Sequence, residues 1–395
     1  MTLIASYILT TMAAVLAVIS AVFAIEIVAS LFFRGWKTAL KSEHRARLAV
    51  LVPAHNEAAG IGGTLDNVKA QLQPNDRLLV VADNCSDDTG AIAAAKGAEV
   101  CVRSDPSRVG KGYALDWGLQ HLERDAPDIV IVLDADCRLT PFAIDHLASA
   151  CQQNDRPVQA LYLMTAPPGS RISHQVAEFA WRVKNLVRPL GLMALGLPCQ
   201  LMGTGMAFPW AVIRSVDLCS GHIVEDLKLG LDLARSGYPP LFCPVARVTS
   251  TFPTSAEASK KQRQRWEHGQ LALVYTTAIP LFLGAIRGRN LGLLILVFDL
   301  LVPPLSLLVG ALTTTVLAST LLAFFGQQLL PLSIGAGGLF VFGLTVILAW
   351  IAYGRSVLPA KSLALIPSYL LAKASHYTSA LRTGLTAEWI RTDRS

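Results

Sequence analysis

The chain has 395 residues, of which 52% are hydrophobic and only 16% are charged, and its mean hydropathy is +0.46. Soluble globular proteins usually carry about 25% charged residues, so a wholly soluble, a disordered or a collagen-like chain is excluded. The net charge of +6 does not indicate nucleic-acid binding, because no basic–aromatic motif is present and many basic residues flank apolar segments.

The charged residues are unevenly distributed along the chain. There are 34 basic and 28 acidic residues, 62 together, and only Glu26 falls within residues 1–33 and only Asp299 within residues 291–354. The other 60 fall in the remaining 298 residues, which is 20% and close to the proportion in an ordinary soluble domain. We therefore expect one soluble domain between two membrane regions.

The N-terminal apolar run, residues 4–33, is long enough to cross a bilayer as a helix. No Lys or Arg precedes it and a basic cluster follows it, which favours an uncleaved anchor with the next domain in the cytoplasm over a cleaved signal peptide. Two further crossings, at 291–325 and 330–353, give three in total, with four as the alternative. Glu26 is expected to pair with a residue of a C-terminal helix. The expected order is an anchor at 1–33, a soluble domain at 45–270, an interfacial segment at 271–290, transmembrane helices at 291–354 and a cytoplasmic or interfacial tail at 355–395.

Between residues 47 and 248, short apolar runs alternate with helical stretches. The predicted strands are 48–52, 77–82, 99–102, 129–133 and 157–164. The predicted helices are 58–72, 87–95, 111–122 and 141–152. Continuous apolar strands that alternate with helices indicate an α/β domain with a mostly parallel, Rossmann-like sheet. Ligands of such sheets bind at the carboxyl ends of the strands.

Polar residues follow three of these strands. Pro53, His55 and Glu57 follow the first strand, Asp83 follows the second, and Asp134 and Asp136 follow the fourth. Crowded carboxylates repel unless a cation compensates, and two carboxylates one residue apart can share Mg²⁺ or Mn²⁺, whose other ligands are water and phosphate. Two simpler interpretations remain: Asp83 and Asp87 as helix caps, and the D-x-D as an ordinary acidic loop. The sequence has no glycine motif of a dinucleotide or P-loop site.

The motifs of residues 47–270, taken in order, resemble those of family-2 glycosyltransferases of the GT-A fold. The resemblance is to the membrane-embedded branch that includes cellulose, chitin and hyaluronan synthases. The matching segments are V-P-A-H-N-E at 52–57, A-D-N-C-S-D at 82–87, G-K-G at 110–112, D-A-D at 134–136, G-T-G at 203–205, V-E-D at 224–226 and Q-R-Q-R-W at 262–266, which reads as Q-x-x-R-W.

This resemblance implies roles for particular residues. The nucleotide-sugar would be bound by Pro53, His55, Glu57, Asp83, Lys111, Asp134, Gln262, Arg265 and Trp266. Asp136, with Asp134, would bind the metal, and Asp226 would be the general base with Glu225 beside it. The acceptor would contact Gly203, Thr204, Gly205 and Trp266.

The expected activity is inverting, metal-dependent hexosyl transfer from a UDP-sugar to a lipid or saccharide acceptor, at the cytoplasmic face of the inner membrane. Such an enzyme would serve cell-envelope or exopolysaccharide synthesis and could work with polysaccharide-export partners. One alternative is a processive synthase of a β-linked polymer. Three departures disfavour it: Asn84-Cys85 after Asp83, Val224 in place of threonine, and no aromatic lead-in to 203–205. The second alternative is a catalytically silent sugar-nucleotide-binding subunit of an export complex. Such a subunit should have lost the D-x-D or the base.

Overall fold

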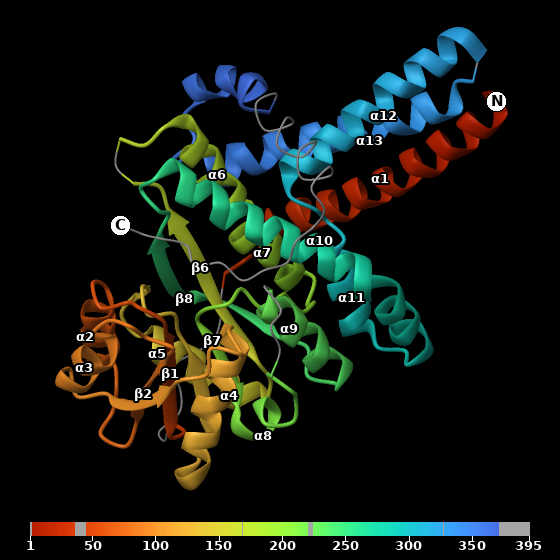
Figure 1. Ribbon diagram of the computed structural model, residues 1–395. Helices are drawn as coiled ribbons and strands as arrows, with labels where there is room; N and C mark the ends of the chain where they lie inside the picture. The colour runs from red at the N-terminus through yellow and green to blue at the C-terminus, as the bar shows by residue number, and fades with distance from the viewer. Residues whose placement is uncertain (1, 36–44, 168, 220–223, 327, 371–395) are drawn as a thin grey trace.

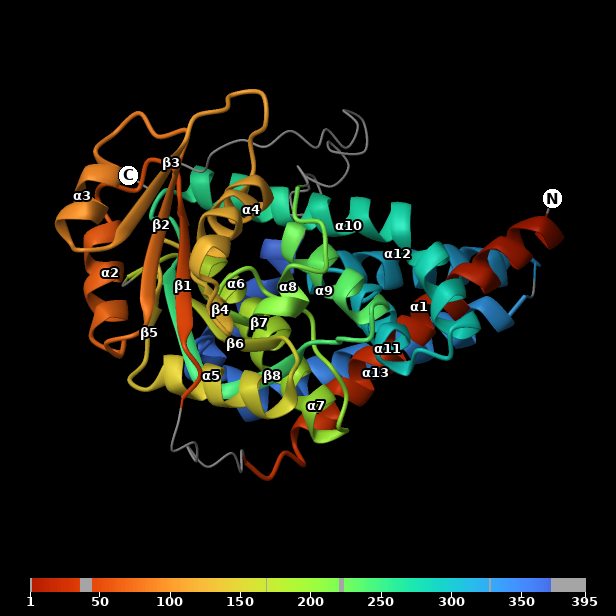
Figure 2. The same cartoon turned by 90° about the horizontal axis from the view of Figure 1, so that it is seen from below.

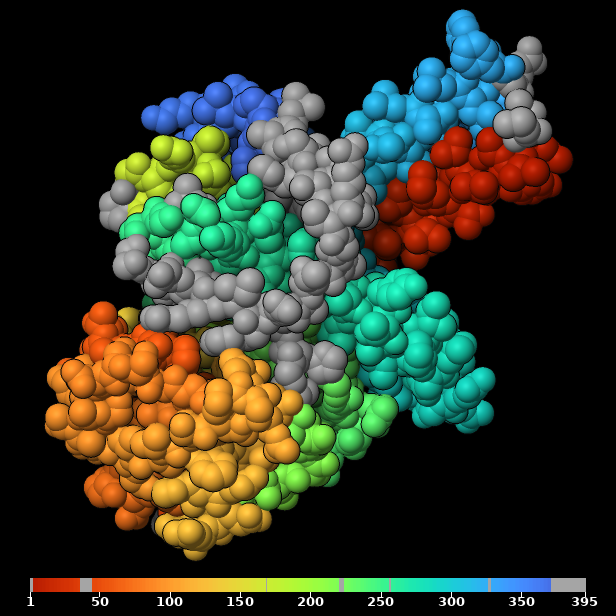
Figure 3. Space-filling view, viewed as in Figure 1, coloured from red at the N-terminus to blue at the C-terminus, as the bar shows by residue number. Residues whose placement is uncertain are grey.

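The computed structural model describes residues 2–35, 45–167, 169–219, 224–326 and 328–370. Figure 1 shows two parts, an α/β domain and a bundle of long helices that projects away from it. The space-filling view in Figure 3 shows the same two parts, with the end of the bundle standing clear of the α/β domain. Residues 371–395 of the expected tail lie outside the described residues.

The α/β domain contains an eight-stranded sheet with the strand order β3-β2-β1-β4-β7-β6-β8-β5. β1 is parallel to β2 and β4, β2 to β3, and β6 to β8, whereas β7 is antiparallel to β4 and β6, and β5 to β8. The strands are β1 (Leu48–Ala54), β2 (Arg77–Asp83), β3 (Glu99–Arg103), β4 (Ile129–Val132), β5 (Arg138–Leu139), β6 (Val158–Thr165), β7 (Met206–Pro209) and β8 (Leu241–Thr251).

Both faces of the sheet are covered because successive side chains of a strand point to opposite sides. Leu48 and Val50 of β1 pack with helices α2, α3 and α5, while Ala49 and Leu51 pack with α4, α8 and α9. The bounds are α2 (Ile61–Lys69), α3 (Thr89–Ala95), α4 (Lys111–Leu122), α5 (Ala143–Asn154), α8 (Trp210–Ile213) and α9 (Glu225–Arg235). Figure 2 shows α2 and α3 on one side of β1–β3 and α4 on the other. The helices on the two faces leave open the edge formed by the carboxyl ends of β1, β2 and β4.

The predicted mostly parallel α/β sheet is confirmed. All five predicted strands and four predicted helices are present with small shifts of their ends. β5, β7 and β8 are additional: the first two have only two and four residues, and β8 mixes buried and exposed positions without a continuous apolar run. All seven cysteines are free thiols.

Three apolar helices form the bundle: α1 (Thr2–Ser30), α12 (Leu305–Gly326) and α13 (Leu330–Ala349). The rings of Phe23 and Phe342 lie 5.6 Å apart between α1 and α13. At one end Ser6 Oγ donates to Gln328 Oε1 at 3.5 Å, and at the other the Tyr353 hydroxyl donates to the Ser30 carbonyl at 2.9 Å. The starts of α1 and α13 therefore lie at the same end of the bundle.

Helix α10 (Ala256–Arg287) lies across the direction of the bundle and over the α/β domain (Figure 1). It packs on α9 and on α11 (Leu291–Leu300). Among the described residues, four helices are long and apolar enough to cross a membrane: α1, α10, α12 and α13. The apolar run at 291–325 is broken at Pro303-Pro304 into α11 and α12, and of these two α12 is long enough to cross a membrane. The expected domain boundary at 270 lies within α10.

Helices α6 (Ile172–Arg182) and α7 (Arg188–Ala194) connect the two parts through a π-helical turn at residues 183–187. Arg188 Nε donates to Glu26 Oε2 at 2.5 Å, and its Nη2 donates to Asp299 Oδ1 at 2.6 Å. Glu26 therefore pairs with Arg188 of α7, and its carboxyl also lies against Asp299 of α11 in the C-terminal apolar region. The lone charges of two apolar segments meet on one guanidinium.

Gly191 places α7 directly against α1, because a Cβ built there would lie 1.7 Å from the Glu26 carbonyl oxygen. We predict that Gly191→Ala separates these helices and destabilises the purified protein by about 1–3 kcal/mol, the usual cost of overpacking. Gly310→Ala on α12 is the control, since a Cβ there meets nothing within 4 Å. Thermal unfolding of both variants checks this, and equal melting temperatures would contradict it.

Candidate functional site

The loops at the carboxyl ends of β1 and β4 border a cavity of about 280 Å³, closed on the opposite side by α6, α7 and α10. We call it the catalytic cavity. Twelve of the sequence-predicted site residues line it: Pro53, His55, Glu57, Lys111, Asp134, Asp136, Gly203, Glu225, Asp226, Gln262, Arg265 and Trp266. Residues far apart in the sequence thus meet in one place.

Asp134 and Asp136 come just after β4, and one carboxylate oxygen of each and the Cys137 sulfur all lie within 4.8 Å of one another. Lys111, at the start of α4, forms an ion pair with Asp134 and donates to the Gly203 carbonyl at 2.6 Å. Burial alone lowers the pKa of Lys111, but Asp134 and the other nearby carboxylates raise it overall. Mg²⁺ and Mn²⁺ prefer oxygen ligands, so Asp134 and Asp136 are the residues that could hold a divalent cation.

Glu225 and Asp226 form the first turn of α9 and face the same cavity. Gly203 has a φ of +89°, and a Cβ there would lie 3.4 Å from Asp226 Oδ2, so the loop at 203 passes close to this carboxylate. Burial raises the pKa of Asp226, and burial together with its neighbour Asp226 raises that of Glu225 to about 8. The positive charge of Lys184 acts in the opposite direction and lowers the pKa of Asp226. A buried carboxylate of raised basicity can accept a proton.

Helix α10 supplies Gln262, Arg265 and Trp266 to the wall of the cavity. The rings of Trp266 and Trp181 lie 4.9 Å apart, so Trp266 packs against α6 and also reaches the cavity. The guanidinium of Arg265 offers paired donors of the kind that bind phosphate.

The wall formed by α6, α7 and the turn between them was not predicted from the sequence. Trp181, Lys184, Asn185 and Arg188 all line the cavity. Lys184 is near enough to Asp226 to affect its pKa. The signal that could have found them is a pair of basic residues four positions apart in a largely apolar helical stretch.

Three predicted residues do not line the cavity: Asp83, Thr204 and Gly205. Thr204 is buried, and its hydroxyl accepts from the Asp134 amide at 3.0 Å. A Cβ at Gly205 would lie 2.6 Å from Val248, so this glycine allows close packing on β8. Thr204 and Gly205 therefore support the cavity from behind.

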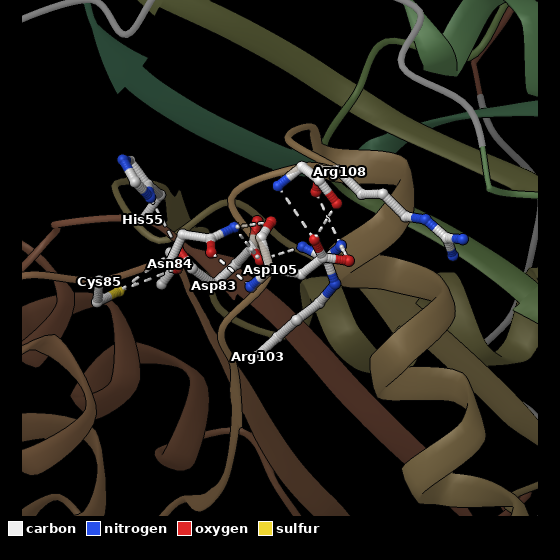
Figure 4. Close-up of polar contacts among 9 residues, drawn as sticks. His55, Asp83, Asn84, Cys85, Arg103, Asp105 and Arg108 are labelled. Carbon is white, nitrogen blue, oxygen red and sulfur yellow. Dashed lines mark hydrogen bonds and ion pairs between the residues drawn. The ribbon is translucent and has the colours of Figure 1, made fainter.

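Asp83 ends β2 and is held by its neighbours, as Figure 4 shows. Its Oδ1 accepts from Arg103 Nη1 at 2.6 Å and from Asn84 Nδ2 at 3.0 Å. Its carbonyl contacts His55 Nδ1 at 2.7 Å, and His55 does line the cavity. The helix-cap interpretation holds for Asp87 and not for Asp83: Asp87 Oδ1 accepts from the amide of Thr89, the first residue of α3, at 3.1 Å, whereas Asp83 makes no capping bond. Asp83 Oδ2 has no hydrogen-bond partner within the described part of the chain.

Residues 44–269 match the family model described as "Glycosyltransferase like family 2". Among curated proteins, "Probable glycosyltransferase YdaM" of Bacillus subtilis is 24% identical over 241 residues, which cover 58% of this chain and 56% of that protein. "Glucosyl-3-phosphoglycerate synthase" of Mycolicibacterium paratuberculosis is 31% identical over 207 residues, covering 48% and 62% respectively. The chain thus spans a little over half the length of these two relatives.

Among solved structures, the mannosyltransferase PcManGT from Pyrobaculum calidifontis, in complex with GDP-Man and Mn²⁺, superposes with a TM-score of 0.51. The superposition covers 85% of this chain and 98% of that one, at 18% sequence identity. This likeness supports the GT-A-like fold.

The ion pair of Asp83 with Arg103 is buried, with both side chains below 10% exposure. Removing one partner of such a pair leaves an uncompensated charge, so we predict that Arg103→Met destabilises the domain by about 3–5 kcal/mol. Lys96→Met, which breaks the exposed pair with Asp66, should cost at most about 1 kcal/mol. Denaturant unfolding measures both, and an equally small loss in the two variants would argue against a structural role for the pair.

Proposed function

Because the chain belongs to the glycosyltransferase-like family 2, we propose that it is an inverting transferase that moves a hexosyl group from a UDP-sugar to a membrane-associated lipid or saccharide acceptor. The observation that carries this proposal is the single cavity in which Asp134 and Asp136, the pair Glu225-Asp226, and Arg265 of α10 face one another. Cell-envelope or exopolysaccharide synthesis is the process that such a transfer serves.

The donor side of the proposal rests on the rim of β1, β2 and β4. Asp136, with Asp134, would hold Mg²⁺ or Mn²⁺, which when bound supplies positive charge to the diphosphate. Lys111 keeps Asp134 in place through its ion pair and adds a second positive charge. The free Oδ2 of Asp83 is suited to accept an N–H of the uracil base, beside His55. Arg265 would contact the phosphates from the opposite wall.

The acceptor side rests on Asp226. The acceptor hydroxyl oxygen forms the new bond to the anomeric carbon, the bond from that carbon to the diphosphate breaks, and its electron pair leaves with UDP. The hydroxyl proton passes to Asp226, whose raised pKa suits a general base. Glu225 is the second carboxylate of the pair, and Lys184 opposes the loss of charge on Asp226. Trp266 presents an apolar face to a sugar ring.

We place α1, α12 and α13 across the membrane and α10 along its inner surface. The orientation follows from the basic residues after α1 and after α13, which belong on the cytoplasmic side. The contacts of Ser6 with Gln328 and of Tyr353 with Ser30 agree with three crossings in this order. The catalytic cavity then lies at the cytoplasmic surface, within reach of membrane lipids.

The two alternatives have less support. A silent sugar-nucleotide-binding subunit should lack the D-x-D or the base, and both are present in the cavity. A processive synthase needs a path for its polymer, and α1, α12 and α13 pack closely against one another in one bundle. A product-length assay separates the alternatives, since a ladder of products supports the synthase.

Asp226→Asn keeps the shape of the side chain but removes proton acceptance. We predict a loss of about 10²–10⁴-fold in kcat, the usual contribution of general base catalysis, with UDP affinity unchanged. Asp232→Asn on the same helix is the matched control, because Asp232 pairs with Lys228 outside the catalytic cavity. Steady-state kinetics and UDP calorimetry make the comparison. Full turnover in Asp226→Asn would refute the assignment of the base.

Asp136→Ala should abolish Mn²⁺-dependent binding of UDP, because one of the two carboxylate ligands is lost. Asp88→Ala is the control, as Asp88 is exposed on the same rim and does not line the cavity. Titration of UDP with and without Mn²⁺ measures the effect. If Mn²⁺ strengthens UDP binding equally in both variants, Asp136 is not a ligand.

A further inference from the structure

A second cavity, of about 450 Å³, lies next to the catalytic cavity and differs from it in chemistry. We call it the apolar cavity. It is bounded by α6, α10, α12 and α13 and by the segment after α13. Its lining is mainly hydrocarbon, including Val176, Phe179, Val309, Leu339, Phe342 and Val346. A saccharide requires many hydrogen-bond partners, which such a lining does not offer.

The two cavities share a wall. Trp181, Lys184, Arg188, Trp266 and Gln270 line both of them. The wall is formed by α10 and by the segment from α6 to α7, so a molecule seated in the apolar cavity has its end next to the catalytic cavity. α10 has a different set of residues on each side: Gln262 and Arg265 face the catalytic cavity, whereas Arg263 and Glu267 face the apolar one.

Two basic residues belong to the shared wall, and they differ in their partners. Arg188 is held by Glu26 and Asp299, but Lys184 has no hydrogen-bond partner in the described ranges, and its ammonium lies 5.9 Å from the ring centre of Trp181. A polar group that arrives between the cavities therefore meets an available donor close to Asp226.

We propose that the apolar cavity binds the hydrocarbon tail of a lipid acceptor, and that the hydroxylated head of this lipid reaches Asp226 across the shared wall, beside Lys184. The proposal rests on the proposed glycosyl transfer and narrows its acceptor from a lipid or a saccharide to a lipid. A hydroxylated head is chosen over a lipid phosphate because Asp226 lines the catalytic cavity as a proton acceptor. An attacking hydroxyl has a proton to give up, whereas a phosphate oxygen is already ionised and needs no base.

Gly343 of α13 offers a way to fill the apolar cavity. It lines the cavity, and a Cβ built there meets nothing within 4 Å, so Gly343→Phe places a ring in open space. Gly337 lies on the same helix, its Cβ also meets nothing within 4 Å, and it does not line the cavity. Gly337→Phe is therefore a matched control for the size and polarity of the substitution.

The first measurement is photolabelling of the full chain in nanodiscs with a diazirine-bearing hexadecanol, followed by mapping of the labelled peptides. We expect labelling of α6 and of the inner face of α13 in the wild type and in Gly337→Phe. In Gly343→Phe this labelling should fall by more than about tenfold, because each displaced methylene changes affinity roughly fourfold. Equal labelling of these peptides in the two variants, or label only on the outer surface of the bundle, would overturn the proposal.

The second measurement separates this proposal from the proposed function. Radiolabelled UDP-sugars are supplied with phosphatidylcholine vesicles containing diacylglycerol or ceramide, with polyprenyl phosphate, or with soluble oligosaccharides, and UDP binding is measured in parallel. Label in the organic phase with a hydroxylated lipid, lost in Gly343→Phe while UDP still binds, is the expected result. Transfer only to oligosaccharides or only to polyprenyl phosphate overturns the lipid assignment but leaves glycosyl transfer standing. A wild type that binds no nucleotide-sugar overturns the proposed function itself.

Discussion

The position of the catalytic domain on the apolar helices depends on one buried guanidinium. Arg188 binds Glu26 of α1 and Asp299 of α11, and all three side chains are less than 10% exposed. A buried charge without its partner is strongly destabilising, so each of the three groups depends on the presence of the others. Because Arg188 follows the segment that carries Lys184, the same contacts fix the wall between the two cavities. The close approach of Gly191 to the Glu26 carbonyl sets the distance between α7 and α1.

A second cation has a similar role on the donor side of the catalytic cavity. Lys111 contacts Asp134 after β4 and the carbonyl of Gly203, so it connects the D-x-D loop to the loop that passes Asp226. The groups that we propose to act on the donor and on the acceptor are thereby held at a fixed separation. Such preorganisation lowers the cost of bringing donor and acceptor together.

The sequence was sufficient to predict the part of the site that follows from parallel strands. β1 lies between β2 and β4, so the residues after β1 and β4 had to meet at one edge, and Glu57, Asp134 and Asp136 do. Pairings between distant segments could not be predicted in this way. Arg103 on Asp83, and Lys184 near Asp226, depend on how β3 and α6 pack, which no local pattern specifies. The continuity of α10 was hidden by the change from charged to apolar residues within one helix.

The arrangement of α10 gives the strongest reason to connect the chemistry with the membrane. Its first half is charged and its second half is apolar, yet it is one helix. The residues of its first half that line the catalytic cavity are therefore rigidly joined to an apolar surface. Tyr275 and Ile279 are exposed on that second half, at 90% and 73%. Exposed apolar side chains of this size are unfavourable in water and favourable at a bilayer surface. A helix anchored there would hold the catalytic cavity against the membrane, where a lipid head can enter from the side while the donor enters from the cytoplasm.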